Sequence, residues 1–109
     1  ALFYLRIIDY CKGVLTSKVG AVDELLVLER LDSYFQEWRK ETIYNEQMKI
    51  LTRMAEYIRA QQEKGLSEST FNKVVKALGN WKSSCTIYNQ KEFISSLLTS
   101  MEKKQNGTQ

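Results

Sequence analysis

Apolar residues recur three and four positions apart along most of this chain, and this spacing places them on one face of an α-helix. No segment alternates apolar and polar residues for long enough to indicate a β-strand. The pattern predicts five helical segments: residues 2–12, residues 22–40, residues 43 up to Gly65, residues 67–79 and residues 89–102.

The residues between these segments are typical of helix ends. Gly65 and Gly79 are expected to stop the third and fourth helices, because glycine is favoured just past a helix C-terminus. Ser67 is expected to cap the fourth helix, and Asn89 followed by Glu92 resembles a capping box at the start of the fifth. The turns between the helices are therefore predicted to be short.

Composition agrees with this pattern, because the chain has no proline and only five glycines. We predict an all-α fold, a compact bundle of four to five helices in a single domain over residues 1–102, without an internal repeat. Residues 103–109 are polar and predicted to form a disordered tail. The sequence opens without Met and inside the first predicted helix, so we expect it to belong to a larger polypeptide. That helix is apolar on both sides and would need two partners.

Candidate chemistry is sparse. The chain has no histidine and two cysteines, Cys11 and Cys85, so it lacks the commonest general base and the ligands of a structural zinc site. The sequence leaves two states open for the cysteines: two reduced thiols, or one disulfide. No phosphate-binding glycine loop occurs, and the first apolar run is interrupted by Arg6 and Asp9. We therefore expect no enzyme activity, no metal, no cofactor and no membrane partner.

The distribution of charge makes nucleic acid a candidate partner. The net charge is +3, and residues 41–109 carry the whole excess. Residues 57–78 are similar to a helix-turn-helix, with Gly65 in the turn, although Gln61 stands where that motif has a small residue. Gly65-Leu66-Ser67 before a Ser/Thr-rich helix start also resembles the core-binding domain of tyrosine recombinases. These resemblances imply DNA contacts by residues of the fourth helix and its basic surroundings: Ser69, Thr70, Asn72, Lys73, Lys76 and Lys82.

Aromatic residues suggest a different partner, another protein. Trp and Tyr are favoured anchors in protein interfaces, and a groove between bundle helices accepts an amphipathic helix. The candidate anchors are Tyr34, Trp38, Tyr44 and Trp81. The same tryptophans lie near helix ends, where they would otherwise close the ends of the core.

The function that the sequence favours is a non-enzymatic docking or scaffold module within a larger intracellular protein. Its partner would be another protein or a partner helix, and the first helix would also accept a second copy of the chain. The alternative is a nucleic-acid-binding domain that uses the basic C-terminal half. The sequence does not distinguish the nucleus from the cytoplasm.

Overall fold

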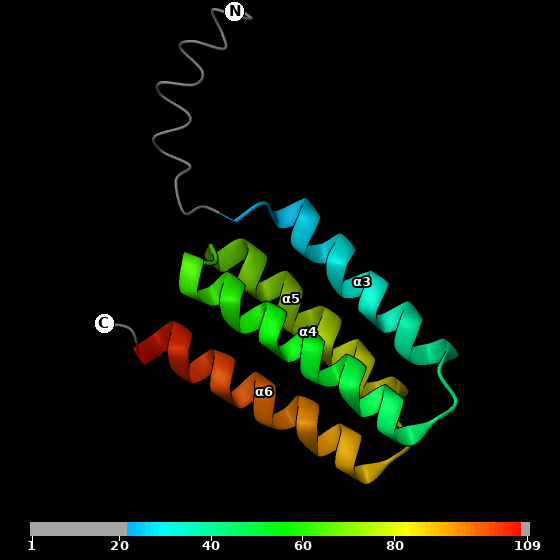
Figure 1. Ribbon diagram of the computed structural model, residues 1–109. Helices are drawn as coiled ribbons and strands as arrows, with labels where there is room; N and C mark the ends of the chain where they lie inside the picture. Colours follow the sequence, from blue (N-terminus) through cyan, green and yellow to red (C-terminus); the bar gives the residue numbers. More distant parts are fainter. Residues whose placement is uncertain (1–21, 108–109) are drawn as a thin grey trace, which may run out of the picture.

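A computed structural model describes residues 22–107, and they form a bundle of four helices (Figure 1). The helices are α3 (Glu24–Lys40), α4 (Tyr44–Lys64), α5 (Glu68–Ser84) and α6 (Tyr88–Gly107). The predicted all-α bundle is confirmed, and four helices account for the described residues. The helix predicted over residues 2–12 lies outside the described residues, as does Cys11.

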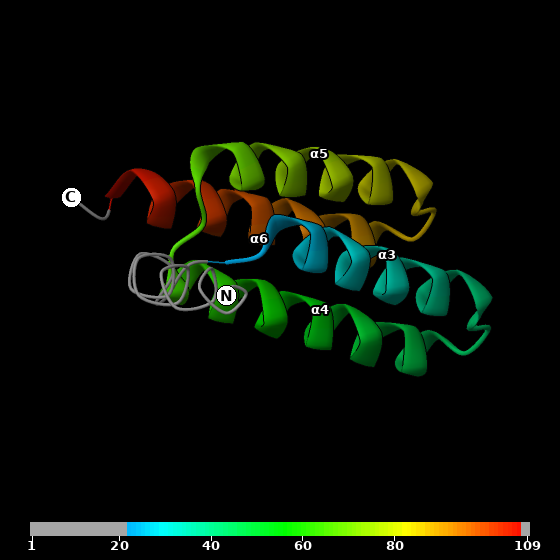
Figure 2. The ribbon, with the colours of Figure 1, turned by 90° about the horizontal axis from the view of Figure 1, so that it is seen from above.

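The helices run alternately up and down, so α3 is parallel to α5 and α4 is parallel to α6 (Figure 1). Around the bundle, α3 packs against α4 and α5, and α6 packs against the same two helices. Seen from above, α4 and α5 lie on opposite sides of the bundle, with α3 and α6 between them (Figure 2). The loop after α4 therefore crosses the end of the bundle diagonally.

The core forms where the predicted apolar stripes of the four helices meet. A fully buried side chain comes from each helix, including Val27 on α3, Met54 on α4, Leu78 on α5 and Ile94 on α6. Burial of each such side chain contributes roughly 1.5–3 kcal/mol relative to leaving it in water. Packing of these stripes, more than the propensity of any one helix, stabilises the bundle.

Local chemistry determines several helix ends, and two of them, the start of α5 and the end of α4, were predicted correctly. The Asp23 carboxylate accepts a hydrogen bond from the Leu26 backbone N–H at 3.3 Å, so α3 begins at Glu24 rather than at residue 22. Ser67 caps α5 by accepting from the Thr70 N–H at 3.1 Å. Gly65 ends α4 with a φ of 108°, a conformation that side-chain-bearing residues adopt only with strain.

Gly79 does not end α5, and that prediction was wrong. The helix continues to Ser84, and Gly79 has an ordinary negative φ. Trp81 and Cys85 extend the buried face of Val74 and Leu78 by a further two turns. The free energy of burying these side chains exceeds the modest cost of one glycine in a helix interior, about 1 kcal/mol relative to alanine.

The prediction for the last helix was wrong at both ends. Asn89 lies inside α6 rather than at its cap, and the first-turn bond runs from the Lys91 N–H to the Ile87 carbonyl. Residues 103–107, expected in a disordered tail, continue α6. The Gln105 side chain holds this last turn, because its amide donates to the Leu66 carbonyl at 3.3 Å.

The hairpin of α3 and α4 and the hairpin of α5 and α6 share a short sequence repeat, contrary to the expectation of no internal repeat. Thr-Ile-Tyr-Asn occurs at residues 42–45 and 86–89, where α4 and α6 begin. Three pairs of identical residues 43 positions apart also meet between the hairpins: Trp38 with Trp81, Gln47 with Gln90, and Gln62 with Gln105. Matching positions therefore face each other across the interface between the hairpins.

Candidate functional site

The two tryptophans expected as docking anchors belong to the core. The exposed fractions of Trp38 and Trp81 are 6% and 3%, so neither presents a surface to a partner. Their ring centroids lie 5.6 Å apart, and Phe35 packs against both, at 5.9 and 5.3 Å. This burial corrects the expectation that they are exposed anchors, because each indole extends the apolar stripe of its own helix.

The indole N–H groups of Trp38 and Trp81 are both buried, and neither has a hydrogen-bond partner within residues 22–107. An unsatisfied buried donor costs roughly 1–3 kcal/mol. The three-ring cluster stabilises these positions through apolar burial and ring contacts instead, each ring pair contributing about 0.5–1.5 kcal/mol beyond its buried area.

The two tyrosines proposed as anchors differ in exposure. Tyr34 is half-buried between α3 and α4, where its ring lies 6.1 Å from that of Tyr57. The Arg30 guanidinium stands 5.3 Å above the Tyr57 ring. Burial raises the pKa of Tyr57, and the positive charge of Arg30 lowers it by less. Tyr44 is exposed and remains available as an anchor.

The sequence repeat places Tyr44 at the same end of the bundle as three other exposed apolar side chains. Because α4 and α6 are neighbours and parallel, both copies of Thr-Ile-Tyr-Asn lie at the same end of the bundle (Figure 1). We call these four residues the Ile-Tyr end, and their exposed fractions are 57% for Ile43, 39% for Tyr44, 37% for Ile87 and 71% for Tyr88.

Polar contacts beneath the Ile-Tyr end fix its position. The Asn89 amide donates to the Tyr44 hydroxyl at 3.5 Å, which joins one copy of the motif to the other. Below them, the Gln90 amide donates to the Gln47 side-chain oxygen at 3.1 Å. The Gln47 amide in turn donates to the backbone carbonyls of Trp38 and Glu41, at 3.1 and 3.0 Å. The starts of α4 and α6, which carry the exposed side chains, are therefore already joined by side-chain hydrogen bonds.

Ile43, Ile87 and Tyr88 are site candidates that sequence reasoning missed. The repeated tetrapeptide Thr-Ile-Tyr-Asn could have identified them. Neither the end of one helix nor the start of the next requires an Ile-Tyr pair, so its occurrence in both loops indicates another role. Their proximity could not be deduced, because it depends on α4 and α6 being adjacent in space.

The residues expected to contact DNA are partly engaged within the protein. The Lys73 ammonium forms an ion pair with the Glu24 carboxylate, which also accepts hydrogen bonds from Ser69 at 3.3 Å and Thr70 at 3.0 Å. Thr70 is buried. The hydrogen bond from Lys73, followed by that from Thr70, holds the pKa of Glu24 below its usual value. These contacts join α3 to α5 rather than leaving three side chains turned outwards.

The arrangement of α4 and α5 also departs from a helix-turn-helix. In that motif two consecutive helices pack at roughly 90–120°. Here α4 and α5 lie diagonally across the bundle, separated by α3 and α6 (Figure 2). The helix-turn-helix expectation over residues 57–78 is therefore corrected, because Gly65 begins a diagonal crossing.

Other predicted DNA contacts remain on the surface of α5. Asn72 and Lys76 are exposed, and Lys82 is half-buried near the end of the helix. Within residues 22–107, neither Lys76 nor Lys82 forms an ion pair.

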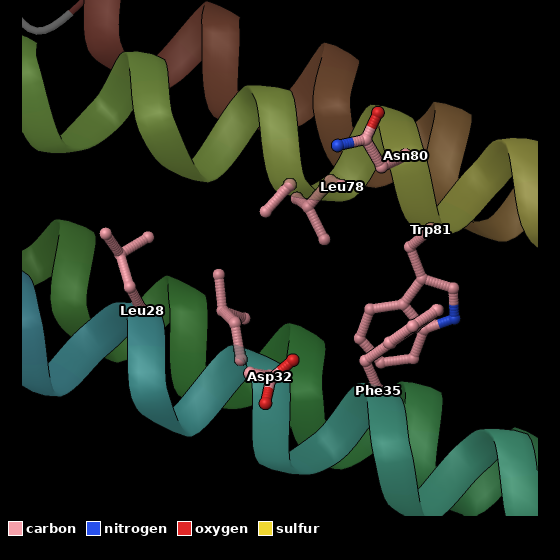
Figure 3. Close-up of a pocket in the computed structure, with 8 residues that line it drawn as sticks. Leu28, Asp32, Phe35, Leu78, Asn80 and Trp81 are labelled. Carbon is pink, nitrogen blue, oxygen red and sulfur yellow. The ribbon is translucent and has the colours of Figure 1, made fainter.

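A groove of about 300 Å³ runs between the parallel helices α3 and α5 (Figure 3). Asp32 from α3 and Asn80 from α5 are its polar lining residues, and both are exposed. In Figure 3 the Asp32 carboxylate lies in front of the α3 ribbon, and the Asn80 amide points away from α3. The remaining lining residues are apolar: Leu28, Leu31, Phe35, Ala77, Leu78 and Trp81.

Cys85 is a buried free thiol after the end of α5. Its Sγ donates to the Trp81 carbonyl at 3.5 Å. Burial raises the pKa of this thiol, and nearby Lys91 opposes the shift by less. Because the thiolate is the reactive form, Cys85 has the environment of a structural cysteine rather than a nucleophile.

Comparisons with family models, with curated proteins and with solved structures find no match to this chain. Within the part of the chain that the structure describes, no three His, Cys, Asp or Glu side chains come together to hold a metal ion. No helix among residues 22–107 is both long enough and apolar enough to cross a membrane.

Proposed function

We propose that this chain is a non-enzymatic docking module and that the Ile-Tyr end contacts its partner protein. The observation that supports the proposal is the exposure of Ile43, Tyr44, Ile87 and Tyr88 at the same end of the bundle, where the neighbouring helices α4 and α6 begin. Apolar side chains gathered in water have a free-energy cost that burial against a partner removes. Tyrosine is also enriched among the residues that dominate binding energy in interfaces.

The hydrogen bonds below this surface support the same proposal. An interface that is fixed before binding loses less conformational entropy when the partner arrives. The bonds from Asn89 to Tyr44 and from Gln90 to Gln47 hold the two helix starts in register. The partner would present an apolar surface of its own, because the four side chains offer little for a charged one.

The experiment identifies the partner and then tests the surface. A photo-crosslinking amino acid at exposed Thr86, beside Ile87, would mark the bound protein inside cells, and mass spectrometry would identify it. Calorimetric titration of the purified pair then compares the wild type with Ile43→Asn and Tyr88→Ser. We expect each substitution to weaken binding about tenfold or more.

Leu25→Ser is the matched control, because Leu25 is an exposed apolar residue, at 67%, on the first turn of α3. Binding should change by less than about twofold in this variant, and all three variants should retain wild-type helicity. Equal affinity for the wild type and both Ile-Tyr variants would reject this surface as the interface.

The second candidate is nucleic-acid binding, and the observation in its favour is that Lys76 and Lys82 have no ion-pair partner among the described residues. Fluorescence anisotropy of a labelled duplex, at low and at physiological salt, tests it. If α5 contacts phosphates, Lys76→Glu and Lys82→Glu each reduce the salt slope by about 1. Absence of binding at low salt would leave these lysines as a solvated face.

A further inference from the structure

We infer that the interface between the two hairpins accepts a second copy of this chain, and that two chains exchange hairpins to form a dimer of two complete bundles. The first hairpin consists of α3 and α4, and the second consists of α5 and α6. In the dimer, the first hairpin of each copy packs against the second hairpin of the other. The inference uses the surface between the hairpins and does not depend on the partner proposed for the Ile-Tyr end.

Three pairs of identical residues show that the interface between the hairpins is close to twofold symmetric. The contacts are 5.6 Å between ring centroids for Trp38 and Trp81, and hydrogen bonds of 3.1 Å for Gln90 and Gln47 and of 3.2 Å for Gln62 and Gln105. The residues of each pair are 43 positions apart, so they occupy equivalent positions of the two hairpins. Equivalent positions meet only on or beside a twofold axis, and this axis runs along the bundle, because the pairs lie towards both of its ends.

The buried positions of the two hairpins repeat at the same spacing. On α4 and α6, buried apolar residues again occur 43 positions apart: Leu51 and Ile94, Met54 and Leu97, and Ile58 and Met101. Each hairpin therefore presents an apolar surface of the same layout to the other. Interfaces in which the same patch occurs on both sides are typical of twofold dimers of identical chains, which is why we infer a second copy as the partner.

Charge determines which hairpins pair in the dimer. Two ion pairs join the hairpins within residues 22–107, one between Lys73 and Glu24 and one between Lys104 and Glu63, at 2.8 Å. Both glutamates belong to the first hairpin, and both lysines belong to the second. A pair of first hairpins would lack both lysines, and a pair of second hairpins would lack both glutamates. Pairing of a first with a second hairpin keeps both contacts, so the exchanged dimer retains the charge complementarity of the closed chain.

The connection between the hairpins favours exchange. Residues 65–67, which we call the hinge, cross the end of the bundle diagonally (Figure 2). Their closed form relies on Gly65 with a φ of 108° and on Ser67 as the cap of α5. A hinge that straightens needs neither feature, and the packing of α3 on α4 and of α5 on α6 is kept. Short hinges of this kind are a common route to dimers by exchange.

The first test follows the exchange in the wild-type chain. A short linker holds two modules at an effective concentration in the millimolar range, so we expect a monomer after refolding at about 10 μM and a fraction of dimer after refolding at about 1 mM. Equal amounts of isotopically labelled and unlabelled full chain are unfolded together in urea and refolded under reducing conditions. Size-exclusion chromatography with light scattering then separates the monomer from the dimer.

Cross-linking shows which chain supplies each hairpin. A carbodiimide joins the Lys104 ammonium to the adjacent Glu63 carboxylate, and mass spectrometry reads the isotopes of the two linked peptides. In the exchanged dimer every such link joins two chains, so about half of the linked pairs should contain one labelled and one unlabelled peptide. In the monomer fraction, which is the internal control, both peptides should carry the same label.

The second test changes the hinge. Gly65→Ala combined with Ser67→Ala removes the residues that end α4 and cap α5, so it disfavours the closed chain and should lower the concentration at which half of the chain is dimeric by about tenfold or more. Gly79→Ala combined with Ser96→Ala is the matched control, because it changes the same residue types inside α5 and on the exposed surface of α6. This control should change that concentration by less than about twofold.

Three results would overturn the inference: a wild type that remains monomeric at about 1 mM, a dimer in which the Lys104–Glu63 links carry a single label, or a hinge variant that dimerises no more readily than its control. A dimer with singly labelled links would be held by another surface, such as the Ile-Tyr end. If the hinge variant loses helicity, the isotope pattern of the wild-type dimer still decides.

Discussion

The helix starts at the two ends of the bundle differ in their polar contacts, although exposed apolar residues lie at both, since Leu25 and Leu26 are exposed on the first turn of α3. At the end where α3 and α5 begin, Asp23 and Ser67 cap the helices, and Glu24 joins them through three side-chain partners. We call this the capped end. At the Ile-Tyr end, Ile43 precedes α4 in the N-cap position and gives it no side-chain hydrogen bond, and four exposed residues there are Ile and Tyr.

This difference in polar contacts distinguishes residues that stabilise the fold from residues that contribute little to its stability. Polar side chains at the capped end satisfy backbone N–H groups that a helix start leaves unpaired. Ile87 and Tyr88 satisfy no backbone group through their side chains and contribute little to the core. The side chain of Tyr88, which is 71% exposed, therefore adds little to stability, and this is why we propose the Ile-Tyr end as the surface for a partner.

The largest change in the free energy of unfolding is expected when a buried aromatic residue, rather than an exposed one, is replaced. Trp38→Ala removes an indole from the three-ring cluster and should lower the free energy of unfolding by about 3–5 kcal/mol. Tyr88→Ala at the Ile-Tyr end should change it by less than about 0.5 kcal/mol. Urea denaturation followed by circular dichroism measures both.

Comparable losses in the two variants would contradict the assignment of Tyr88 to a surface that folding does not use. Trp38→Phe serves as the control for Trp38→Ala, since it keeps a ring in the cluster and removes an N–H that has no hydrogen-bond partner among the described residues. Its loss should be clearly smaller than that of alanine.

The next test uses the two glycines that sequence reasoning treated alike. Gly65 at the capped end has a φ of 108°, so Gly65→Ala should destabilise the protein by about 1 kcal/mol or more. Gly79 lies inside α5, where an added Cβ would meet no atom within 4 Å. Gly79→Ala should therefore stabilise the protein by roughly 0.5–1 kcal/mol.

Thermal unfolding of both variants, in parallel with the wild type, measures these opposite effects. Gly65→Asn provides the control, because asparagine tolerates positive φ better than alanine and should lose less stability. A stabilising Gly65→Ala would show that the end of α4 does not require its left-handed backbone.

These glycines also show what the sequence could predict. The start of α5 and the end of α4 were correct, because Ser67 and Gly65 act on backbone groups within a few residues. The end of α5 was wrong because it depends on burial of Trp81 and Cys85 against other helices. Helix ends that follow local chemistry were predictable, and those that follow tertiary packing were not.

The candidate sites show the same division. Periodicity identified Trp38 and Trp81 as members of apolar stripes but could not say whether they faced a core or a partner, because a stripe alone does not show what covers it. Lys73 looked like a free cation until α3 brought Glu24 beside it. Of the four proposed aromatic anchors, only Tyr44, which borders a loop, is exposed.

The smallest expected effect concerns the pH dependence of the capped end. The pKa of Glu24 is lowered by its hydrogen bonds from Lys73 and Thr70, so the folded state favours its ionised form more than the unfolded state does. The resulting stability is present above the unfolded-state pKa and is lost as the pH falls through the lower, folded-state value. Glu24→Gln should therefore be less stable than the wild type at pH 7 and should approach it as the solution becomes more acidic than the usual pKa of 4.5.

Chemical denaturation of both proteins across pH 7 to 3 measures the narrowing difference. Glu56→Gln is a suitable control, because Glu56 is exposed on α4 and has no ion-pair partner within the described range. Its stability should follow that of the wild type at every pH. A Glu24→Gln deficit that stays constant down to pH 3 would mean that geometry at the start of α3, rather than the charge of Glu24, joins α3 to α5.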